Sequence, residues 1–455
     1  MAHPTDPIAI VGAGIAGLVT AAVLRSHGID CRLIEQTTRF GTVGAGIQLS
    51  PNGVRILQRL GLAPALAATA VTARSIETRR WDDASLLAHT PHGQACNDLF
   101  GAPYYLIHRA DLQKCLLSAL PADFVTLGTA CARVVEHLDH AEIHHTDGSV
   151  TRARLVIGAD GVHSTVRRAV VDDAPRFSGY AVHRGLVPAD TVPSFRDDPR
   201  VLFWLGPGRH VTYYPIAGSS TVHFSAVGAV TTTPQHTTPQ HTTPQHTTSP
   251  RHAITPQHAT TSRYDLPPHA DPHDTASRAG AVEDLAAAFT GWHEEVRRVV
   301  TAARSVTRWG LFDRDIAPHY ATGRVALVGD AAHPMLPYLS QGANQALEDA
   351  VVLAHCLADT HPHDPAPALR RYQALRHPRT AEIHRRARTL AHSFHLPDGA
   401  QQSARDTTLR ATGDLAHLRW LYGYDAHAAT DTSAATGAHA APGIPTAADR
   451  RLPTP

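Results

Sequence analysis

Short apolar runs that end at glycine-rich turns are the most regular feature of the chain. Residues 8–11 read IAIV, an uninterrupted apolar run typical of a strand buried on both faces. A glycine-rich turn follows, and residues 15–22 then carry apolar side chains at the spacing of one helix face. A second strand is expected over residues 30–35. Strand, turn, helix and strand in this order predict the start of a parallel α/β sheet.

Two later segments repeat the pattern of a buried strand followed by a turn. Residues 155–157 are apolar and lead into the turn GADG. Ser164 and Arg167 follow on an incipient helix, three residues apart, so both are expected to face one ligand. The segment 323–334, GRVALVGDAAHP, is another strand that ends in Gly-Asp. An NAD dehydrogenase needs only the first of these motifs, followed by a catalytic domain.

The middle of the chain predicts a different kind of sheet. Residues 200–228 contain three apolar stretches separated by the turns GPG and AGSS, which is typical of antiparallel strands. Strand alternation places His210, Thr212 and Tyr214 on one face of the second strand. Residues 371–396 are predicted to form a helix whose basic face is solvated and which packs across the first domain.

Length and charge limit the possible partners. The chain has 455 residues, 43% of them hydrophobic, which favours two or three domains. With 41 basic and 40 acidic residues it has no basic stripe for nucleic acid or anionic lipid, so a small molecule is the expected partner. The five cysteines are scattered, and no export signal or membrane span is recognised, which predicts a cytoplasmic protein. No oligomeric state is predicted.

Two segments have compositions that do not favour a packed core. Residues 231–262 form a near-perfect repeat of Thr, Pro, Gln and His, and are expected to be a disordered surface loop. The repeat lacks Cys and carboxylate partners for its histidines, so no metal site is predicted. Residues 426–455 are rich in Ala, Thr and Pro and are expected to be a disordered tail.

The first turn carries the pattern of a dinucleotide site. Gly12, Gly14 and Gly17 allow a tight turn and close approach of a pyrophosphate to the N-terminus of a helix. Glu35, at the end of the second strand, suits an adenosine ribose with free hydroxyls. FAD and NAD both satisfy this motif.

The three motifs together resemble the single-component flavoprotein monooxygenases of the para-hydroxybenzoate hydroxylase type. They are GAGIAG at 12–17, GADGVHSTVR at 158–167, and GDAAHPMLPYLSQGANQALEDA at 329–350. The resemblance covers about residues 6–425 apart from the repeat. Three further segments look most like the branch of 3-hydroxybenzoate 6-hydroxylase and salicylate hydroxylase, namely GAGIQLSPNGVRIL at 44–57, IHRADL at 107–112 and WLYGYDA at 420–426.

The resemblance implies an α/β fold. A Rossmann-like FAD-binding domain of the GR2 type would carry an inserted antiparallel β-sheet substrate domain and C-terminal helices. The expected FAD-binding domain comprises 1–75, 100–175 and 318–395. The substrate domain would comprise 76–99 and 176–317, interrupted by the repeat, and 396–425 would be a C-terminal helical segment.

The resemblance also implies which residues hold FAD. Glu35 would bind the ADP part, Arg109 the phosphate or the ribityl chain, and Asp330 the ribityl hydroxyls. The helix N-terminus at Gly342 would face the flavin pyrimidine and stabilise negative charge on the reduced ring. The second motif would serve both FAD and a transient nicotinamide cofactor, NADH or NADPH. The full expected set is Gly12, Gly14, Ala16, Gly17, Glu35, Gln48, Arg109, Asp160, Gly161, Arg167, Gly329, Asp330, Pro337, Gly342, Ala343 and Asn344. His333 is expected to be structural.

The implied reaction is hydroxylation of an aromatic ring by dioxygen through a flavin C4a-hydroperoxide. Such a site needs a base for the substrate hydroxyl. His210, Tyr214 and Pro215 match the spacing of pocket residues in 3-hydroxybenzoate 6-hydroxylase-like sequences, so His210 is the candidate base and Tyr214 the orienting group. The alternative is a structural histidine. Arg184 could bind a substrate carboxylate, although a salt bridge at the domain interface is favoured.

The expected substrate is a monohydroxybenzoate, either 3-hydroxybenzoate or a salicylate-like acid. An epoxidase or tailoring hydroxylase of a secondary metabolite is the alternative, because the same motifs serve such enzymes. A flavin-binding protein without turnover is the third possibility.

Overall fold

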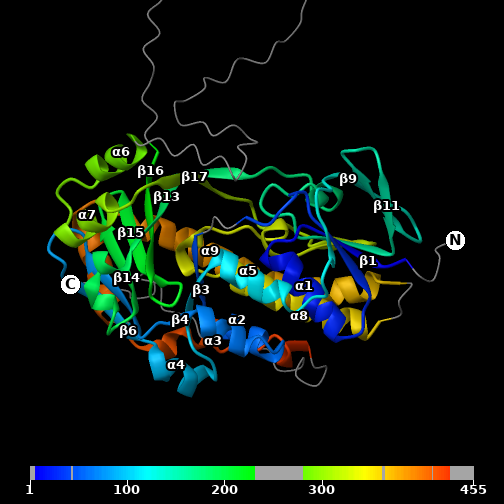
Figure 1. Ribbon diagram of the computed structural model, residues 1–455, viewed down its shortest axis with the longest axis horizontal. Coiled ribbons are helices and arrows are strands. Elements are labelled where there is room, and N and C mark those ends of the chain that lie inside the picture. Colours follow the sequence, from blue (N-terminus) through cyan, green and yellow to red (C-terminus); the bar gives the residue numbers. More distant parts are fainter. Residues whose placement is uncertain (1–5, 42–44, 231–279, 361–363, 412, 431–455) are drawn as a thin grey trace, which may run out of the picture.

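The computed structural model describes residues 6–41, 45–230, 280–360, 364–411 and 413–430. The repeat at 231–262 lies outside these residues, as does most of the expected tail. Residues 428–430, at the start of that tail, form a short helical turn, η7 (Ala428–Thr430). The described residues build two large sheets at opposite ends of the molecule, joined by long helices (Figure 1).

A six-stranded sheet forms the centre of one end. Its order is β18-β19-β12-β1-β2-β8, and every neighbouring pair is parallel except β18 with β19. The strands predicted at 8–11, 30–35 and 155–157 are confirmed in this sheet. The strands are β1 (Ile8–Val11), β2 (Cys31–Ile34), β8 (Val125–Thr126), β12 (Leu155–Gly158), β18 (Ala321–Thr322) and β19 (Val325–Leu327).

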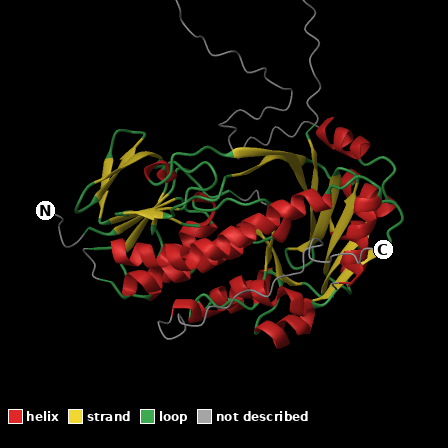
Figure 2. Cartoon of the chain, turned by 180° about the vertical axis from the view of Figure 1, so that it is seen from behind, coloured by secondary structure: helices red, strands yellow, loops and turns green. Residues whose placement is uncertain are grey.

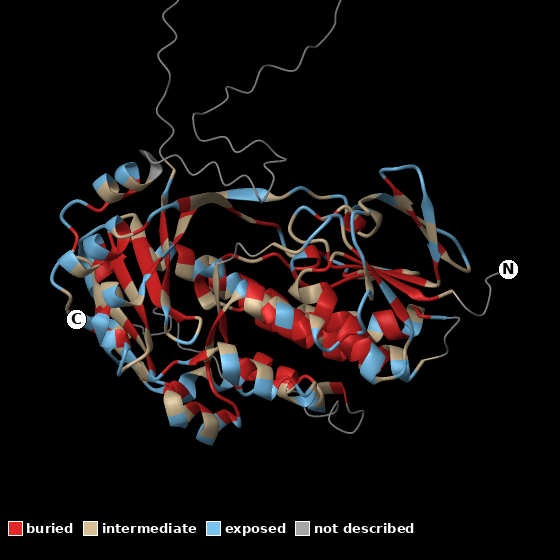
Figure 3. Ribbon diagram, viewed as in Figure 1, coloured by how far each residue is buried: buried red, intermediate tan, exposed pale blue. Residues whose placement is uncertain are grey.

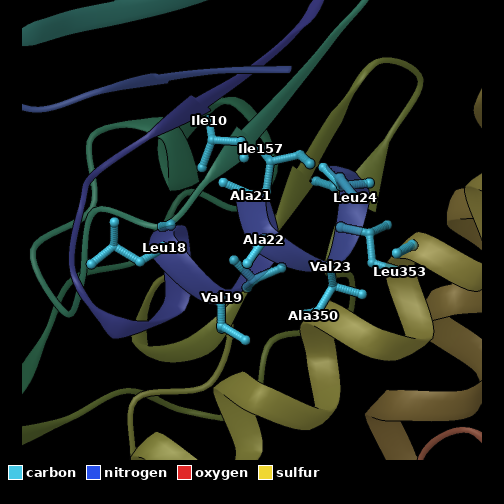
Figure 4. Packing of buried hydrophobic residues seen from close by; sticks show 14 of the residues in the cluster. Ile10, Leu18, Val19, Ala21, Ala22, Val23, Leu24, Ile157, Ala350 and Leu353 are labelled. Atoms are coloured by element: carbon cyan, nitrogen blue, oxygen red, sulfur yellow. The ribbon is translucent and has the colours of Figure 1, made fainter. Parts of the chain in front are cut away.

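Helices α1 (Ile15–Ser26) and α8 (Gly342–Ala358) pack against each other beside this sheet. Small residues allow the contact, since Ala22 and Ala350 lie in the same buried cluster as Val19, Val23 and Leu353 (Figure 4). Helix α1 begins directly after β1 and its turn, so its N-terminus lies at the carboxyl edge of the sheet. Helix α8 begins after β19 and the segment 328–341, and Gly342 at its start lies next to Asp330 at the same edge.

A seven-stranded sheet forms the other end, in the order β17-β13-β16-β15-β14-β5-β6. All neighbours are antiparallel except β14 with β5. The three strands predicted in the middle of the chain are confirmed as β14, β15 and β16. The strands are β5 (Ser75–Arg80), β6 (Leu86–Pro91), β13 (Arg176–Pro188), β14 (Arg200–Gly206), β15 (Arg209–Ile216), β16 (Thr221–Ala229) and β17 (Val306–Asp313).

The outer face of this sheet is covered by α6 (Gly280–Ala288) and α7 (Glu294–Thr301) (Figure 1). Trp204, Tyr213 and Phe224 from the sheet and Trp292 and Val299 from the helical segment share one apolar core there. The inner face of the sheet turns toward the rest of the molecule. Figure 3 shows that burial continues from the sheets into the central helices.

Smaller elements complete the fold. Two three-stranded sheets have the orders β3-β7-β4 and β11-β10-β9. Their strands are β3 (Gly46–Leu49), β4 (Val71–Thr72), β7 (Tyr105–His108), β9 (Cys131–Glu136), β10 (Ala141–His145) and β11 (Val150–Ala153). The remaining α-helices are α2 (Pro51–Arg59), α3 (Ala63–Thr69), α4 (Gly93–Phe100), α5 (Arg109–Leu117), α9 (Ala366–Phe394), α10 (Ala400–Ala411) and α11 (Arg419–Tyr422). An α/β fold with an antiparallel sheet and C-terminal helices is therefore confirmed.

Helix α9 runs between the two ends of the molecule, as the view from behind shows (Figure 2). The Tyr372 hydroxyl donates to Leu327 O in the six-stranded sheet, at 2.8 Å. The expected solvated basic face is wrong in part. Arg376 is fully buried and pairs with Glu348 and Asp349 of α8 at 2.6 and 2.7 Å. Charge in this helix therefore ties α9 to α8.

Candidate active site

The turn between β1 and α1 is closely packed on one side and open on the other. Gly12 has φ of +102°, and a Cβ on Gly17 would lie 1.8 Å from Gly12 O. A Cβ on Gly14, the residue that caps α1, would meet nothing within 4 Å. The helix N-terminus at Gly14 thus faces open space, which suits a pyrophosphate.

Glu35 is fixed beside this turn by backbone amides. Its carboxylate accepts hydrogen bonds from Ala13 N at 2.7 Å and Thr37 N at 2.9 Å. These bonds hold the end of β2 against the start of α1. The predicted contact between Glu35 and the ribose remains a prediction.

The second motif serves the fold more directly than expected. The Asp160 carboxylate accepts from Ser164 Oγ and from Thr165 N at 2.7 Å. Gly161 takes φ of +79°, so the turn needs a glycine. The expectation that Ser164 and Arg167 face one ligand is wrong, because the hydroxyl of Ser164 points to Asp160 within the turn.

The side chain of Arg167 bonds to other residues of the protein. It is 1% exposed, and its Nη1 donates to Ala331 O at 2.8 Å and Ala332 O at 2.7 Å. Its Nε and Nη2 pair with Asp173, each at 2.7 Å. Arg167 therefore fastens the second motif to the turn of the third motif, and so helps to place Asp330.

Asp330 lies in a recess at the carboxyl edge of the six-stranded sheet. Its side chain is exposed, yet burial by the surrounding protein raises the pKa of Asp330, with His333 and Arg109 acting in the opposite direction. The exposure of Asp330 and its raised pKa are consistent if the carboxylate faces a space that protein atoms surround. A Cβ on Gly342 would lie 3.7 Å from Asp330 Oδ1, so the carboxylate lies next to the N-terminus of α8.

The rest of the third motif braces this recess. Asp349 Oδ2 accepts from Gly329 N at 2.8 Å and from His333 Nε2 at 2.6 Å. His333 thus makes the structural contact expected of it. A Cβ on Gly329 would lie 2.9 Å from the Cβ of Ala16, so the first and third motifs touch.

The side chain of Asn344 forms hydrogen bonds with the backbone of β3 and the residue after it. Its Oδ1 accepts from Ser50 N at 3.0 Å, and its Nδ2 donates to Gln48 O at 3.2 Å. Only the backbone amide of Asn344 is left for a cofactor, together with those of Gly342 and Ala343 in the first turn of α8. Pro337 is exposed at the start of η5 (Pro337–Leu339).

These residues fit FAD. Two helix N-termini, an open space at Gly14 and an acid in a recess suit a ligand with a pyrophosphate, hydroxyls and a ring that becomes negative on reduction. Arg109 is exposed at the start of α5, close enough to Asp330 to affect its pKa.

The inner face of the seven-stranded sheet is polar although it is largely buried. The register pairs Arg184 with Ser225, Ser225 with Thr212, and His223 with Tyr214. Paired residues in antiparallel strands share a face, so this face carries Arg184, His210, Thr212, Tyr214, His223 and Ser225. Buried polar groups need partners, and a face that gathers so many of them is suited to bind a polar ligand.

The guanidinium of Arg184 makes no ion pair or hydrogen bond with another described residue, whereas its backbone oxygen accepts from Thr307 Oγ1. The expected salt bridge at a domain interface is therefore wrong for the described part of the chain. Burial lowers the pKa of Arg184, while Tyr214 acts to raise it. A half-buried guanidinium without a carboxylate is available for an anionic ligand.

Tyr214 lies beside Gln48. The amide of Gln48 interacts with the Tyr214 hydroxyl, and Gln48 Oε1 accepts from the Tyr104 hydroxyl at 2.7 Å. Gln48, expected to bind cofactor, thus joins two tyrosines at one end of the inner face. The Nδ1 atom of His223 is buried there without a partner in the described chain.

His210 lies at the other end. It is 5% exposed, and its Nδ1 lies 2.8 Å from Nε2 of His395, the residue that caps α9. Burial and then the neighbouring His395 hold the pKa of His210 well below its usual range. A neutral imidazole is the form that a general base requires. His210 and Tyr214 do not meet, because four residues of strand separate them by about 13 Å.

The FAD binding domain family matches residues 5–387, which is most of the chain. The chain belongs to this family. It is a flavoprotein aromatic monooxygenase of the para-hydroxybenzoate hydroxylase type. The chain is 60% identical to a 3-amino-4-hydroxybenzoate 2-monooxygenase of Streptomyces cremeus, over 91% of this chain and 94% of that protein. It is 49% identical to the enzyme of the same name from Streptomyces platensis, over 92% and 96%.

Solved structures agree with this monooxygenase fold. Klebsiella pneumoniae HpxO, in complex with FAD and uric acid, is 27% identical with a TM-score of 0.73, covering 89% of this chain and 93% of that one. A salicylate hydroxylase substrate complex is 26% identical with a TM-score of 0.71, covering 93% and 97%.

The expected branch is corrected by these identities. The 3-hydroxybenzoate 6-hydroxylase of Klebsiella oxytoca is 31% identical over 91% of the chain, about half the identity found with the Streptomyces cremeus enzyme. The monooxygenase therefore stands nearer to the aminohydroxybenzoate enzymes. The segments that suggested the other branch therefore do not decide the branch.

Sequence reasoning missed His223 and His395. Neither of these two residues, among 33 histidines, belongs to a motif. His395 is also 185 residues away in sequence from His210, the residue that it contacts. A further group, His137, His140 and Glu142, could hold a metal ion at the surface of the β9–β10 hairpin, away from the site. No described helix of the monooxygenase is both long and apolar enough to cross a membrane.

Proposed function

We propose that the protein hydroxylates 3-amino-4-hydroxybenzoate at C2, using FAD, dioxygen and NADH or NADPH. The observation that carries the proposal is the 60% identity with the Streptomyces cremeus enzyme, which extends over 91% of the chain. The inner sheet face supports it, because a cationic group and a neutral base lie at separate places on one surface.

Arg184 would bind the substrate carboxylate, and Tyr214 would border that end of the ring. Arg184 and His210 lie two strands apart and two residues apart along the strands, so their Cα atoms are separated by about 12 Å. The two side chains would therefore bind different edges of one aromatic ring.

Bound FAD would accept electrons from the nicotinamide cofactor and activate dioxygen. The residues of the chain orient and activate the ring. C2 is ortho to the amino group and meta to the hydroxyl, so electron donation to C2 comes from the amino nitrogen. His210 Nε2 would accept a hydrogen bond at the end of the ring that carries the amino and hydroxyl groups, and would strengthen this donation. The covered sheet excludes water from the reacting ring.

The test is oxidation of NADH and NADPH by the purified holoenzyme with a series of ring acids. We expect stimulation and a hydroxylated product with 3-amino-4-hydroxybenzoate, and little with 3-hydroxybenzoate or salicylate. Equal or better turnover of the latter two acids would overturn the proposed substrate.

A matched pair of substrates tests Arg184. Arg184→Gln should raise KM for 3-amino-4-hydroxybenzoate by roughly tenfold or more, because a charge-assisted bond is lost. It should change KM little for the neutral analogue 3-amino-4-hydroxybenzamide. Arg176→Gln, on the exposed end of the same strand, is the control. An equal effect of Arg184→Gln on both substrates would exclude Arg184 as the carboxylate ligand.

A further inference from the structure

We propose that His395 is a positioning residue that fixes the tautomer of His210 and leaves the Nε2 lone pair of His210 directed to substrate. The chemical role of that lone pair rests on the proposed function. The pairing of the two histidines does not, because it follows from the contacts of the folded chain.

A backbone carbonyl fixes the tautomer of His395. His395 Nδ1 lies 2.8 Å from Ala391 O, one turn back in α9. A carbonyl oxygen only accepts hydrogen bonds, so the proton of this contact must reside on His395 Nδ1. Burial lowers the pKa of His395 to about 4, although the bond to Ala391 acts in the opposite direction. His395 is therefore neutral near pH 7, and its Nε2 is an acceptor.

The second step crosses from α9 to β15. His395 Nε2 lies 2.8 Å from His210 Nδ1. Since His395 Nε2 accepts, His210 Nδ1 must donate. His210 is also neutral, so its remaining nitrogen, Nε2, carries a lone pair. Among the described residues this Nε2 has no hydrogen-bond partner. One carbonyl thus determines the tautomer of both rings.

The surroundings hold both rings in place. Tyr180 of β13 stacks on His395, with ring centroids 4.3 Å apart and planes inclined by 22°. Tyr338 and Phe394 each lie 5.5 Å from His210, measured between ring centroids. The ring of His210 therefore has little freedom to turn its other nitrogen toward the substrate.

The contact between His395 and His210 places the C-terminal end of α9 beside the proposed base. His395 caps α9, whose other contacts reach the six-stranded sheet. His210 on β15 is consequently oriented by a helix that also contacts the six-stranded sheet. Removal of the acceptor at position 395 should free His210 to adopt the other tautomer without removing any group that touches substrate.

The direct test is nitrogen NMR of histidine in the full-length holoenzyme, labelled with 15N in its histidine rings. The His210 signals are assigned by their loss in His210→Gln. We expect a protonated Nδ1 and an unprotonated Nε2 in the wild type near pH 7. A protonated Nε2 would overturn the proposal whatever the substrate proves to be, so its failure is distinguishable from failure of the proposed function.

Two substitutions extend the test to function. His395→Leu removes the acceptor and should lower kcat on the order of 10²-fold, the lower end of the contribution of a general base. KM should change little. His395→Gln offers an amide oxygen to His210 Nδ1 and should restore most of the rate and the wild-type tautomer. His392→Leu, which alters an exposed histidine of the same helix, is the control.

Two results would contradict this role. One is an unchanged rate in His395→Leu that has a normal flavin content. The other is an equal loss in His395→Gln and His395→Leu, which would mean that His395 acts only by filling space. If His395→Leu loses flavin, the test rests on His395→Gln, which keeps the acceptor. A wild-type tautomer and rate in His395→Gln would support the proposal, and a protonated Nε2 of His210 in that variant would contradict it.

Discussion

Tyr214 lies directly over Gly46, so that a Cβ on Gly46 would be 2.6 Å from Tyr214 Cε2 and 2.9 Å from His223 Cδ2. Strand β3 therefore approaches the inner sheet face as closely as a backbone without side chain allows. This contact brings Gln48 of β3 to the hydroxyl of Tyr214. It is the place where the FAD-binding half meets the proposed carboxylate end of the substrate site.

Gly46→Ala should accordingly damage substrate binding more than flavin binding. The added methyl group must displace Tyr214 or His223, and overpacking of this kind costs about 1–3 kcal/mol. If that cost falls on the bound state, the affinity for the ring acid should be about 5-fold to about 140-fold weaker, with flavin retained. Ligand titration of the oxidised holoenzyme measures it. Gly228→Ala on β16 is the control, since its Cβ would meet only the flexible chain of Arg209 at 3.2 Å. Unaltered ligand affinity in Gly46→Ala would contradict this account.

The sequence predicted the parts of this site that are local. The apolar run at 8–11 and the alternation around His210 determine strands and faces within a few residues, and both were confirmed. The pairing of Arg376 with Glu348 and Asp349 was missed, because charged residues in a helix resemble a solvated face until a second helix covers them. The contact of His210 with His395 depends on where α9 ends relative to β15. No local pattern carries that information.

The first turn offers a test that separates cofactor binding from folding. Gly14→Ala adds a methyl group where the protein has open space, so the thermal stability of the apoprotein should not change. The same methyl group should obstruct close approach of the pyrophosphate and weaken FAD affinity by roughly tenfold or more, equivalent to 1.4 kcal/mol. Flavin titration of the apoprotein measures the affinity. Gly17→Ala is the contrasting variant, since its Cβ would strike Gly12 O and should destabilise the fold itself. Normal FAD affinity in Gly14→Ala would argue against a pyrophosphate at this turn.

The buried ion pairs between α8 and α9 predict a large effect on stability. Arg376→Met would leave Glu348 and Asp349 without one of their cationic partners in the interior, and breaking such a pair costs about 3–5 kcal/mol. Chemical unfolding of the holoenzyme measures the loss. Arg385→Met is the control on the same helix, because Arg385 is 61% exposed and pairs with Glu382. That change should cost about 0–1 kcal/mol. Equal losses in the two variants would show that the buried pairs contribute no more than exposed ones.

Buried histidines predict that the protein loses stability in mild acid. Burial lowers the pKa of His92, His183, His395 and His427 to about 4, and that of His223 to about 3. Well above pH of about 6.5 these rings are neutral in both the folded and the unfolded chain. As the pH falls from about 6.5 toward 4, the unfolded chain takes up protons that the folded chain excludes, so the free energy of unfolding decreases. Thermal unfolding midpoints of the flavin-saturated enzyme should fall over this range. In His92→Gln, which removes one such ring, the slope should be shallower. Midpoints that stay level or rise between pH 6.5 and 4.5 would contradict the prediction.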